Sequence, residues 1–330
     1  MQAQTMSGTA VLVVAETRDG VVTPLTFELL GLARALALEL GGCVAAAIFA
    51  DDSAAAEALG VHGADRVYVC ALKGAEEYEG DVWLPNVEHI ARDIKPLAVL
   101  VGHTPAGADL APRLAFRLES AVATACVGIT VESGRLLLTR PCYGGNVRET
   151  IFVTTVPAVA TIKAGVGTAQ PDASRKGEVM RIAAQAVQPR ARVIAREREA
   201  AASARLEDAR IIVAGGRGLE GPEGFGVLEN LAGVLGAAVG SSRVPCDLGW
   251  CPHSWQIGLT GKTVTPDLYV AVGISGAGHH MAGCGNAKTI VAINTDPDAA
   301  IFKEARFGVV GDYRKIVPAL AHAVSQLKQD

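Results

Sequence analysis

Two glycine-rich loops in the last third of the chain have the residue types that bind phosphates. The first, at 216–221 (GRGLEG), follows an apolar run at 209–216 and has the spacing of the GxGxxG dinucleotide fingerprint. Its glycines would let backbone N–H groups and a helix N-terminus approach a pyrophosphate. Pro222 stands where that fingerprint is already helical, so the loop predicts nucleotide binding without naming the nucleotide.

The end of the next predicted strand, at 237–243, limits the choice of nucleotide. The fingerprint places an acidic residue there for the ribose hydroxyls, whereas this strand ends in Ser242-Arg243. An arginine could bind a 2′-phosphate, which keeps an NADP-dependent oxidoreductase open, although no hydride-transfer residues follow. A nucleotide-binding regulatory module without redox chemistry is a further alternative.

The second loop, at 273–280 (GISGAGHH), also lies between a predicted strand and a predicted helix. Tight turns would explain its glycines, but not Ser275 beside two histidines; the hydroxyl and loop amides suit a phosphate. Between the two loops lies the polar segment 256–262 (QIGLTGK), which has hydroxyl and amide donors. With Arg217 and Arg243, these donors predict an electron-rich planar ligand.

Composition excludes other classes of function. Of 330 residues, 50% are hydrophobic, which is ample for about two domains, and the net charge of −4 indicates no nucleic-acid partner. Aromatic residues make up 5%, too few for base-stacking platforms. No apolar run reaches the ~18 residues of a membrane span, and the N-terminus lacks a signal-peptide pattern. We therefore expect a cytoplasmic protein that is not an integral membrane protein.

Seven scattered cysteines without a CxxC motif predict neither a disulfide framework nor a zinc site, and they fit a reducing compartment. Cys246, Cys251 and His253 come nearest to a metal cluster, but their spacing is not that of a zinc motif and a second pair is missing. Buried or incidental thiols are the preferred interpretation, and no metal is expected.

The elements that position these loops follow a βα rhythm. Continuous apolar runs at 10–16, 43–50, 65–70 and 97–103 predict strands buried on both faces. Helices are predicted at 24–40, around 87–94 and after Thr104-Pro105, so these strands form a parallel sheet. From 126 to 156 the pattern predicts antiparallel hairpins at one sheet edge, turning at Ser133-Gly134 and at 144–146.

A second α/β unit follows an arginine-rich segment at 181–210, which predicts an edge strand and a linker. Strands are predicted at 209–216, 237–243, 267–273, 289–294 and 307–312, with helices at 223–236 and from Tyr313 onwards. The predicted fold class is α/β, with two Rossmann-like parallel-sheet domains, at 1–205 and 206–330, the first with an antiparallel extension.

The C-terminal half resembles the FAD domain of the electron transfer flavoprotein alpha subunit (the ETF alpha or FixB family). The resemblance rests on AGGRGL, VGSSRVPCD, QIGLTGKTVTPDLYVAVGISGA, AKTIVAINTDP and FGVVGD, which occur in the family's order and spacing. HTPAGADLAPRLAFRL and RPCYGGN extend it into the N-terminal half. It implies a DHS-like FAD-binding domain at 206–330 and a scaffold and subunit interface at 1–205.

The resemblance also implies which residues hold FAD. Arg217, Ser242 and Arg243 would lie near the flavin ring, Thr260 would donate to its N5, and His280 would lie at the pyrimidine O2. A cation there would favour the negatively charged reduced flavin and raise its potential. The remaining expected cofactor residues are Gln256, Ile257, Gly258 and Leu259 in the flavin loop, Ser275, Gly276, Ala277, Gly278 and His279 at the pyrophosphate, and Asn294 and Asp312 at the adenosine end.

Two positions depart from the family pattern. Leu259 stands where the family usually has Gln, and Gly278-His279 stands where an apolar residue and Gln are usual. His279 could still donate to a phosphate, in a pH-dependent way.

The function implied is electron carriage rather than bond-making catalysis. The expected partners are a beta subunit in a heterodimer, an acyl-CoA dehydrogenase-type donor of the kind used in beta-oxidation, and a quinone-linked or other acceptor. An electron-bifurcating form that uses NADH and a second flavin remains open, because those sites would lie mostly in the beta subunit.

Overall fold

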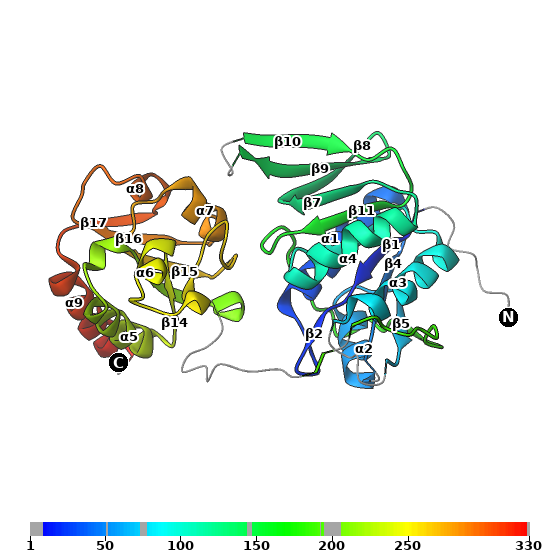
Figure 1. Ribbon diagram of the computed structural model, residues 1–330, viewed down its shortest axis with the longest axis horizontal. Coiled ribbons are helices and arrows are strands. Elements are labelled where there is room, and N and C mark those ends of the chain that lie inside the picture. The colour runs from blue at the N-terminus through cyan, green and yellow to red at the C-terminus, as the bar shows by residue number, and fades with distance from the viewer. Residues whose placement is uncertain are drawn as a thin grey trace. The chain divides into compact units, whose positions relative to one another are not determined.

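The computed structural model describes residues 9–50, 52–72, 78–143, 147–191, 193–194 and 206–328. The chain separates into two compact units, one formed mainly by residues up to 196 and the other by residues from 197 onwards (Figure 1). The expected boundary near residue 205 and the expected turn at 144–146 lie outside the described residues.

The N-terminal unit is built on a seven-stranded sheet in the order β12-β5-β4-β1-β6-β11-β7, with parallel pairing throughout. Its strands are β1 (Val11–Val14), β4 (Val44–Ile48), β5 (Arg66–Cys70), β6 (Ala98–Gly102), β7 (Val122–Cys126), β11 (Ala158–Ile162) and β12 (Glu178–Ile182). Its helices are α1 (Pro24–Leu40), α2 (Ser53–Val61), α3 (Gly80–Ile94) and α4 (Pro105–Arg117). β1, β4 and β6 are buried along their whole length, as expected for continuous apolar runs.

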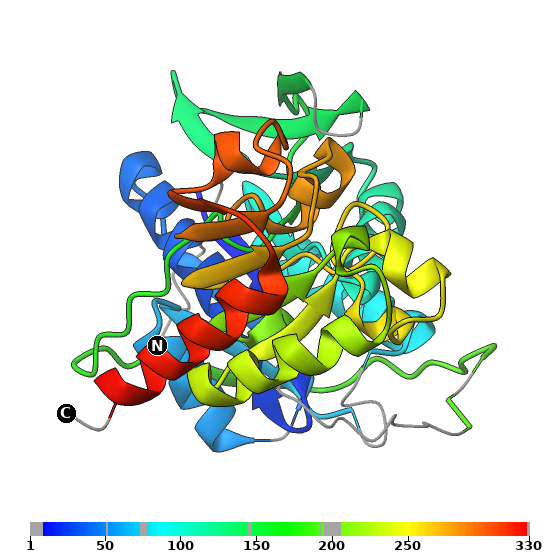
Figure 2. The same ribbon diagram turned by 90° about the vertical axis from the view of Figure 1, so that its left-hand side faces the viewer.

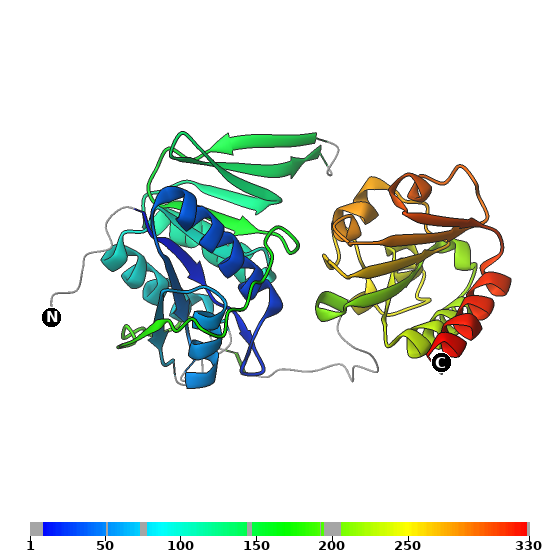
Figure 3. The ribbon, with the colours of Figure 1, turned by 180° about the vertical axis from the view of Figure 1, so that it is seen from behind.

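Helices cover both faces of this sheet. Val11 and Val13 of β1 pack in one core with α1 and α2, whereas Leu12 and Val14 pack in a second core with α3 and α4. The arrangement is visible from both sides in Figures 1 and 3. A short hairpin of β2 (Thr17–Arg18) and β3 (Val21–Val22) follows β1 and was not predicted.

The predicted antiparallel extension is a separate three-stranded sheet in the order β10-β9-β8. Its strands are β8 (Gly128–Glu132), β9 (Arg135–Cys142) and β10 (Val147–Phe152). β8 and β9 pair across the predicted turn, where both Ser133 and Gly134 have positive φ, as a two-residue hairpin requires. The three-stranded sheet adjoins the β7 edge of the large sheet, where the N–H of Val127, directly after β7, donates to Thr139 O of β9 at 2.8 Å.

The C-terminal unit contains a five-stranded parallel sheet in the order β14-β13-β15-β16-β17 (Figure 2). Its strands are β13 (Ile211–Gly215), β14 (Ala238–Ser241), β15 (Leu268–Val272), β16 (Ile290–Asn294) and β17 (Phe307–Val310). Its helices are α5 (Glu223–Leu235), α6 (Arg243–Asp247), α7 (Gly278–Cys284), α8 (Ile301–Glu304) and α9 (Tyr313–Leu327), with 3₁₀ turns η2 (Leu206–Asp208), η3 (Arg217–Leu219) and η4 (His253–Trp255). α5 and α9 pack on one face, and α7 and α8 pack on the other.

The α/β class, the parallel sheets and the antiparallel extension are confirmed. In the described part of the chain, no helix is long and apolar enough to cross a lipid bilayer.

Candidate functional site

The sequence-predicted site residues lie at or after the carboxyl ends of the strands in the C-terminal unit. Strand order reverses between β13 and β15, because the chain goes to β14 on one side of β13 and to β16 on the other side of β15. Open α/β sheets bind ligands in the crevice outside the carboxyl ends of strands at such a switch point. The two glycine-rich loops therefore flank the place where this fold forms a ligand site.

These two loops pack backbone against backbone. Gly218 N donates to Gly273 O at 3.0 Å, and Gly216 N donates to Val272 O at 2.9 Å. A Cβ placed on Gly216 would lie 2.2 Å from Gly273 O, so only glycine fits there. Arg217, between the two glycines, is exposed in η3.

Ser242 and Arg243 differ from their predicted setting at the end of a strand. β14 ends at Ser241, Ser242 is the N-cap residue of α6, and Arg243 begins that helix. The guanidinium of Arg243 pairs with Asp247 one turn later, with Nε and Oδ2 3.0 Å apart. Asp247 is not among the predicted site residues, although an Arg–Asp pair at i,i+4 is a recognisable signal.

One cavity of about 150 Å³ brings half of the predicted residues together. It is lined by Arg243, Gln256, Ile257, Gly258, Leu259, Thr260, His279 and His280. Ile257 N donates to Ser241 O at 2.8 Å, and Leu259 N donates to His279 O at 2.7 Å. The flavin loop 256–260 is thus held by backbone bonds between β14 and α7, and Leu259 and Thr260 are exposed along it.

The hydroxyl of Thr260 has a fixed role. Gln256 is buried and its Nε2 donates to Thr260 Oγ1 at 2.9 Å. Because this bond uses a lone pair of the hydroxyl oxygen, the Thr260 proton is left to donate elsewhere. Gln256 therefore acts as a positioning residue for a hydrogen-bond donor at the cavity.

His280 forms the buried wall of the cavity. Its Nδ1 lies 3.0 Å from Ile257 O and its Nε2 lies 2.9 Å from Tyr269 Oη. Since a carbonyl can only accept, Nδ1 carries the proton and Nε2 accepts from the tyrosine. Burial lowers the pKa of His280 to about 4, so the ring is neutral. Its expected contact with a flavin oxygen stays a prediction, with both ring nitrogens already hydrogen-bonded within the protein.

Of the predicted pyrophosphate residues, Ser275, Gly276 and Ala277 lie in the loop between β15 and α7, Gly278 and His279 begin α7, and His279 also lines the cavity. Ser275, Ala277, Gly278 and His279 are exposed. Gly276 has φ +82° and packs so closely that a Cβ would lie 2.3 Å from Ile301 N. Exposed amides and one hydroxyl at the end of a strand suit a phosphate.

Asn294 and Asp312 also lie outside the cavity, and each has a structural task. Asn294 Nδ2 donates to Ile274 O at 2.9 Å, and its Oδ1 accepts from Asp296 N at 3.1 Å. Asp312 Oδ1 accepts from Arg314 N at 2.9 Å and caps α9. Their expected contacts with adenosine stay predictions.

Comparison with known proteins identifies the family. Residues 11–187 match the Electron transfer flavoprotein domain, and residues 205–285 match the Electron transfer flavoprotein FAD-binding domain. The alpha subunit of Thermoanaerobacterium thermosaccharolyticum electron transfer flavoprotein is 41% identical over 95% of this chain and 97% of its own length. The chain belongs to the electron transfer flavoprotein alpha-subunit family.

Other members of the electron transfer flavoprotein alpha family also match this chain over nearly its full length. The alpha subunit of Bacillus subtilis is 39% identical over 97% of this chain and 98% of its own length. Protein FixB of Clostridium saccharobutylicum is 37% identical over 97% of this chain and 96% of its own length. The resemblance and the FAD cofactor expected from the sequence are thereby confirmed.

The residues present fit the FAD of this family. The cavity has a cation, Arg243, and an oriented donor, Thr260, beside the apolar side chain of Leu259. The exposed Ser275 loop has the small residues that a phosphate needs to approach a backbone.

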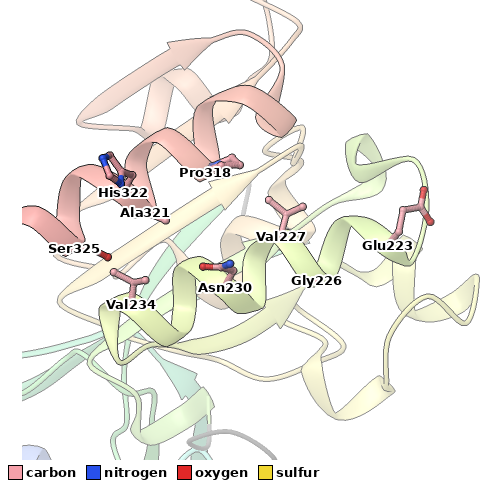
Figure 4. Close-up of a pocket in the computed structure, with 9 residues that line it drawn as sticks. All are labelled: Glu223, Gly226, Val227, Asn230, Val234, Pro318, Ala321, His322 and Ser325. Atoms are coloured by element: carbon pink, nitrogen blue, oxygen red, sulfur yellow. The ribbon is translucent and has the colours of Figure 1, made fainter.

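A cavity of about 500 Å³ between α5 and α9 is a separate feature (Figure 4). It is lined by Glu223, Gly226, Val227, Asn230, Val234, Pro318, Ala321, His322 and Ser325, none of which is a predicted cofactor residue. It lies between two helices of one face rather than at the strand ends, and it shares no lining residue with the cavity of about 150 Å³.

We expect Thr260→Val to lower the reduction potential of bound FAD, because the substitution removes the oriented hydrogen-bond donor while keeping the side-chain volume. Gln256→Leu should act in the same direction but less strongly, since it leaves the hydroxyl present and unoriented. The reduction potential of bound FAD, measured by redox titration, should fall in both variants. Ser325→Ala, in the separate cavity, is the control; equal potentials in all three variants would contradict the role of Thr260.

Proposed function

We propose that this chain is the FAD-binding alpha subunit of a heterodimeric electron transfer flavoprotein. It would receive electrons from acyl-CoA dehydrogenase-type flavoenzymes and pass them to a quinone-linked oxidoreductase or another acceptor. The observation that carries the proposal is the cavity of about 150 Å³, because eight residues expected from the family motifs line it together. Within the proposal, residues 206–330 are the cofactor domain and residues 1–205 are the scaffold and subunit interface.

Bound FAD supplies the electron-carrying ring; the protein binds it and sets its electrostatic surroundings. Arg217, Ser242 and Arg243 would place positive charge and a hydroxyl beside the ring, and Thr260 would donate a hydrogen bond to it. The loop Ser275–His279 would bind the pyrophosphate through backbone amides. The remaining expected contacts are those of Gln256–Leu259 and His280 with the flavin, and of Asn294 and Asp312 with the adenosine.

Alpha subunits of this family pair with a beta subunit, and the antiparallel sheet of the N-terminal unit offers a surface for such a partner. Phe152 at the end of β10 is 49% exposed and Val156 after that strand is 62% exposed, and both line one cavity of about 280 Å³. Neighbouring exposed apolar side chains on a sheet are a feature of protein-binding surfaces.

The test uses this chain co-purified with its beta subunit. Visible flavin absorption bands, and their bleaching by a reduced acyl-CoA dehydrogenase, are the expected results. Failure of the heterodimer to bind FAD on reconstitution would overturn the proposal. Two flavins per heterodimer with reduction by NADH would indicate the electron-bifurcating form instead. Binding of NADP in place of FAD would favour the alternative of an NADP-dependent oxidoreductase.

We expect Arg243→Ala to lower the reduction potential of bound FAD, because a positive charge that favours the reduced, anionic ring is removed. A unit charge about 4 Å away in water is worth about 1 kcal/mol, which is roughly 20 mV for a two-electron couple. Arg243→Lys should keep most of the potential. Asp247→Asn should raise it, since Asp247 is the carboxylate paired with this guanidinium. A redox titration in which Arg243→Ala matches the unmodified protein would refute the electrostatic role.

A further inference from the structure

The two cysteines that flank the turn after α6 lie against each other. Cys246 Sγ and Cys251 Sγ are 3.5 Å apart. Gly249 N donates to Cys246 O at 2.9 Å, and Trp250 N donates to Pro245 O at 2.9 Å, which closes the end of α6. Gly249, with φ +72°, then turns the chain so that Cys251 faces back toward Cys246.

The two sulfurs differ in their surroundings. Cys246 is 2% exposed, and its Sγ lies 3.6 Å from both Ser242 O and Pro252 O. Cys251 is half-buried, and the residues that follow it, Pro252 and His253, are exposed. The Cys251 side chain is therefore partly open to solvent, while that of Cys246 is almost completely buried.

The more exposed of the two thiols, that of Cys251, is also the more acidic one. The thiol of Cys246 stabilises a Cys251 thiolate by hydrogen bonding and so lowers the pKa of Cys251 below its usual value, while the same contact raises the pKa of Cys246. Burial raises the pKa of Cys126 to about 11 and that of Cys284 to about 12. Cys251 thus has the more available thiolate, which is the nucleophilic form.

We propose that Cys246 and Cys251 are a reversible dithiol–disulfide couple that reacts with small-molecule disulfides, with Cys251 attacking and Cys246 resolving. The proposal is independent of the flavin. The sulfurs need to approach by about 1.5 Å to reach the ~2.05 Å of a disulfide bond. In the described part of the chain, no group of three or more His, Cys, Asp or Glu side chains could hold a metal ion together with these two thiols.

The reaction is thiol–disulfide exchange and needs no other oxidant. The Cys251 thiolate attacks one sulfur of the small disulfide, which breaks its S–S bond and releases one thiolate. Cys246 then loses its proton and attacks Cys251 Sγ, which forms the protein disulfide and releases the second thiolate. Two protein thiols are oxidised, and one small-molecule disulfide is reduced to two thiols.

The test treats the reduced full chain with oxidised glutathione at neutral pH, followed by alkylation and trypsin. Cleavage after Arg243 and Lys262 gives a peptide, 244–262, whose cysteines are Cys246 and Cys251 only. We expect this peptide to be unalkylated and two hydrogens lighter than its dithiol form, and to return to the dithiol with excess reduced thiol. Alkylation of both cysteines after oxidation would overturn the proposal.

Two variants separate the attacking and resolving roles. Cys246→Ser should accumulate a glutathione adduct on Cys251, whereas Cys251→Ser should leave Cys246 as a free thiol. A Cys246 adduct in the second variant would refute the assigned order.

A measurement on the unmodified chain needs no variant to fold. Cys251 should be alkylated by iodoacetamide about ten-fold or more faster than the half-buried Cys43, whose pKa is raised by burial and by Asp65. Equal rates would also overturn the proposal.

Discussion

Replacing Gly216 by alanine is expected to destabilise the C-terminal unit by about 1–3 kcal/mol or more and to release bound FAD. The added methyl would lie 2.2 Å from Gly273 O and 2.8 Å from Ile274 Cα, and both are backbone atoms that cannot rotate away. Gly216 has φ −112°, so the cost is steric and not conformational. The two glycine-rich loops, which pack backbone against backbone, would have to move apart. This packing sets the positions of Arg217 and of the loop that contains Ser275.

The measurement is amide hydrogen exchange of peptides from β13 and β15, with a peptide from β6 in the other unit as an internal reference. FAD content after desalting is measured on the same samples. The matched control is Gly226→Ala on α5, where a Cβ meets nothing within 4 Å; it should leave protection equal or higher, because alanine favours a helix. Gly216→Ala with the protection and FAD content of Gly226→Ala would disprove the argument.

Elements fixed by local chemistry were the ones that the sequence could predict. α1 begins and ends where expected, because Thr23 caps its start, Pro24 occupies the first turn and Gly41 adopts φ +64° at its end. The strands β13, β15 and β16 were found because a strand covered on both faces must be apolar throughout. The ends of these strands then located the candidate loops.

Elements that depend on distant pairing or on a few residues were not predicted. β11 lies between β6 and β7, and nothing in its own five residues states which strands flank it. α6 has five residues, too few for a periodic pattern, so the sequence alone predicts a strand end at Arg243. The contact of Cys246 with Cys251 depends on the turn at Gly249, which a spacing of five does not reveal.

Within the candidate site, residue types were more predictable than their hydrogen-bond partners. The motifs indicated Thr260, His280 and Arg243, and the structure places the last two in α7 and α6. Asp247, four residues after Arg243, has the local signal of an i,i+4 pair. The contact of His280 with Tyr269 joins two elements and depends on packing, so no local pattern in the sequence reveals it.

Acidification is expected to weaken the C-terminal unit through His280. Its pKa is about 4 in the folded protein because of burial, against an ordinary value of 6.5. Between these values the unfolded chain binds a proton that the folded chain does not, so the stability is fully present above pH 6.5 and is lost as the pH falls toward 4. A difference of about 2.5 pKa units amounts to about 3 kcal/mol.

The buried side chains in contact with His280, those of Tyr269 and Cys284, do not titrate in this range. Burial raises the pKa of Tyr269 well above its usual value and that of Cys284 to about 12, so both stay protonated. Protonation of Nε2 would require the Tyr269 hydroxyl to stop donating to it, and would place a charge in the wall beside the flavin loop. FAD retention should therefore fall over the same pH range as protection of β15 peptides from amide exchange.

His280→Asn tests this origin, because the asparagine amide can still donate to Ile257 O but does not titrate. We expect this variant to be less stable at neutral pH and to lose the pH dependence between 6.5 and 4. His322→Gln, at an exposed position on α9, should keep the full dependence. If His280→Asn retains the same slope of unfolding free energy against pH, the acid sensitivity comes from another group; a flat profile in the unmodified chain would show that the buried imidazole can be protonated in place.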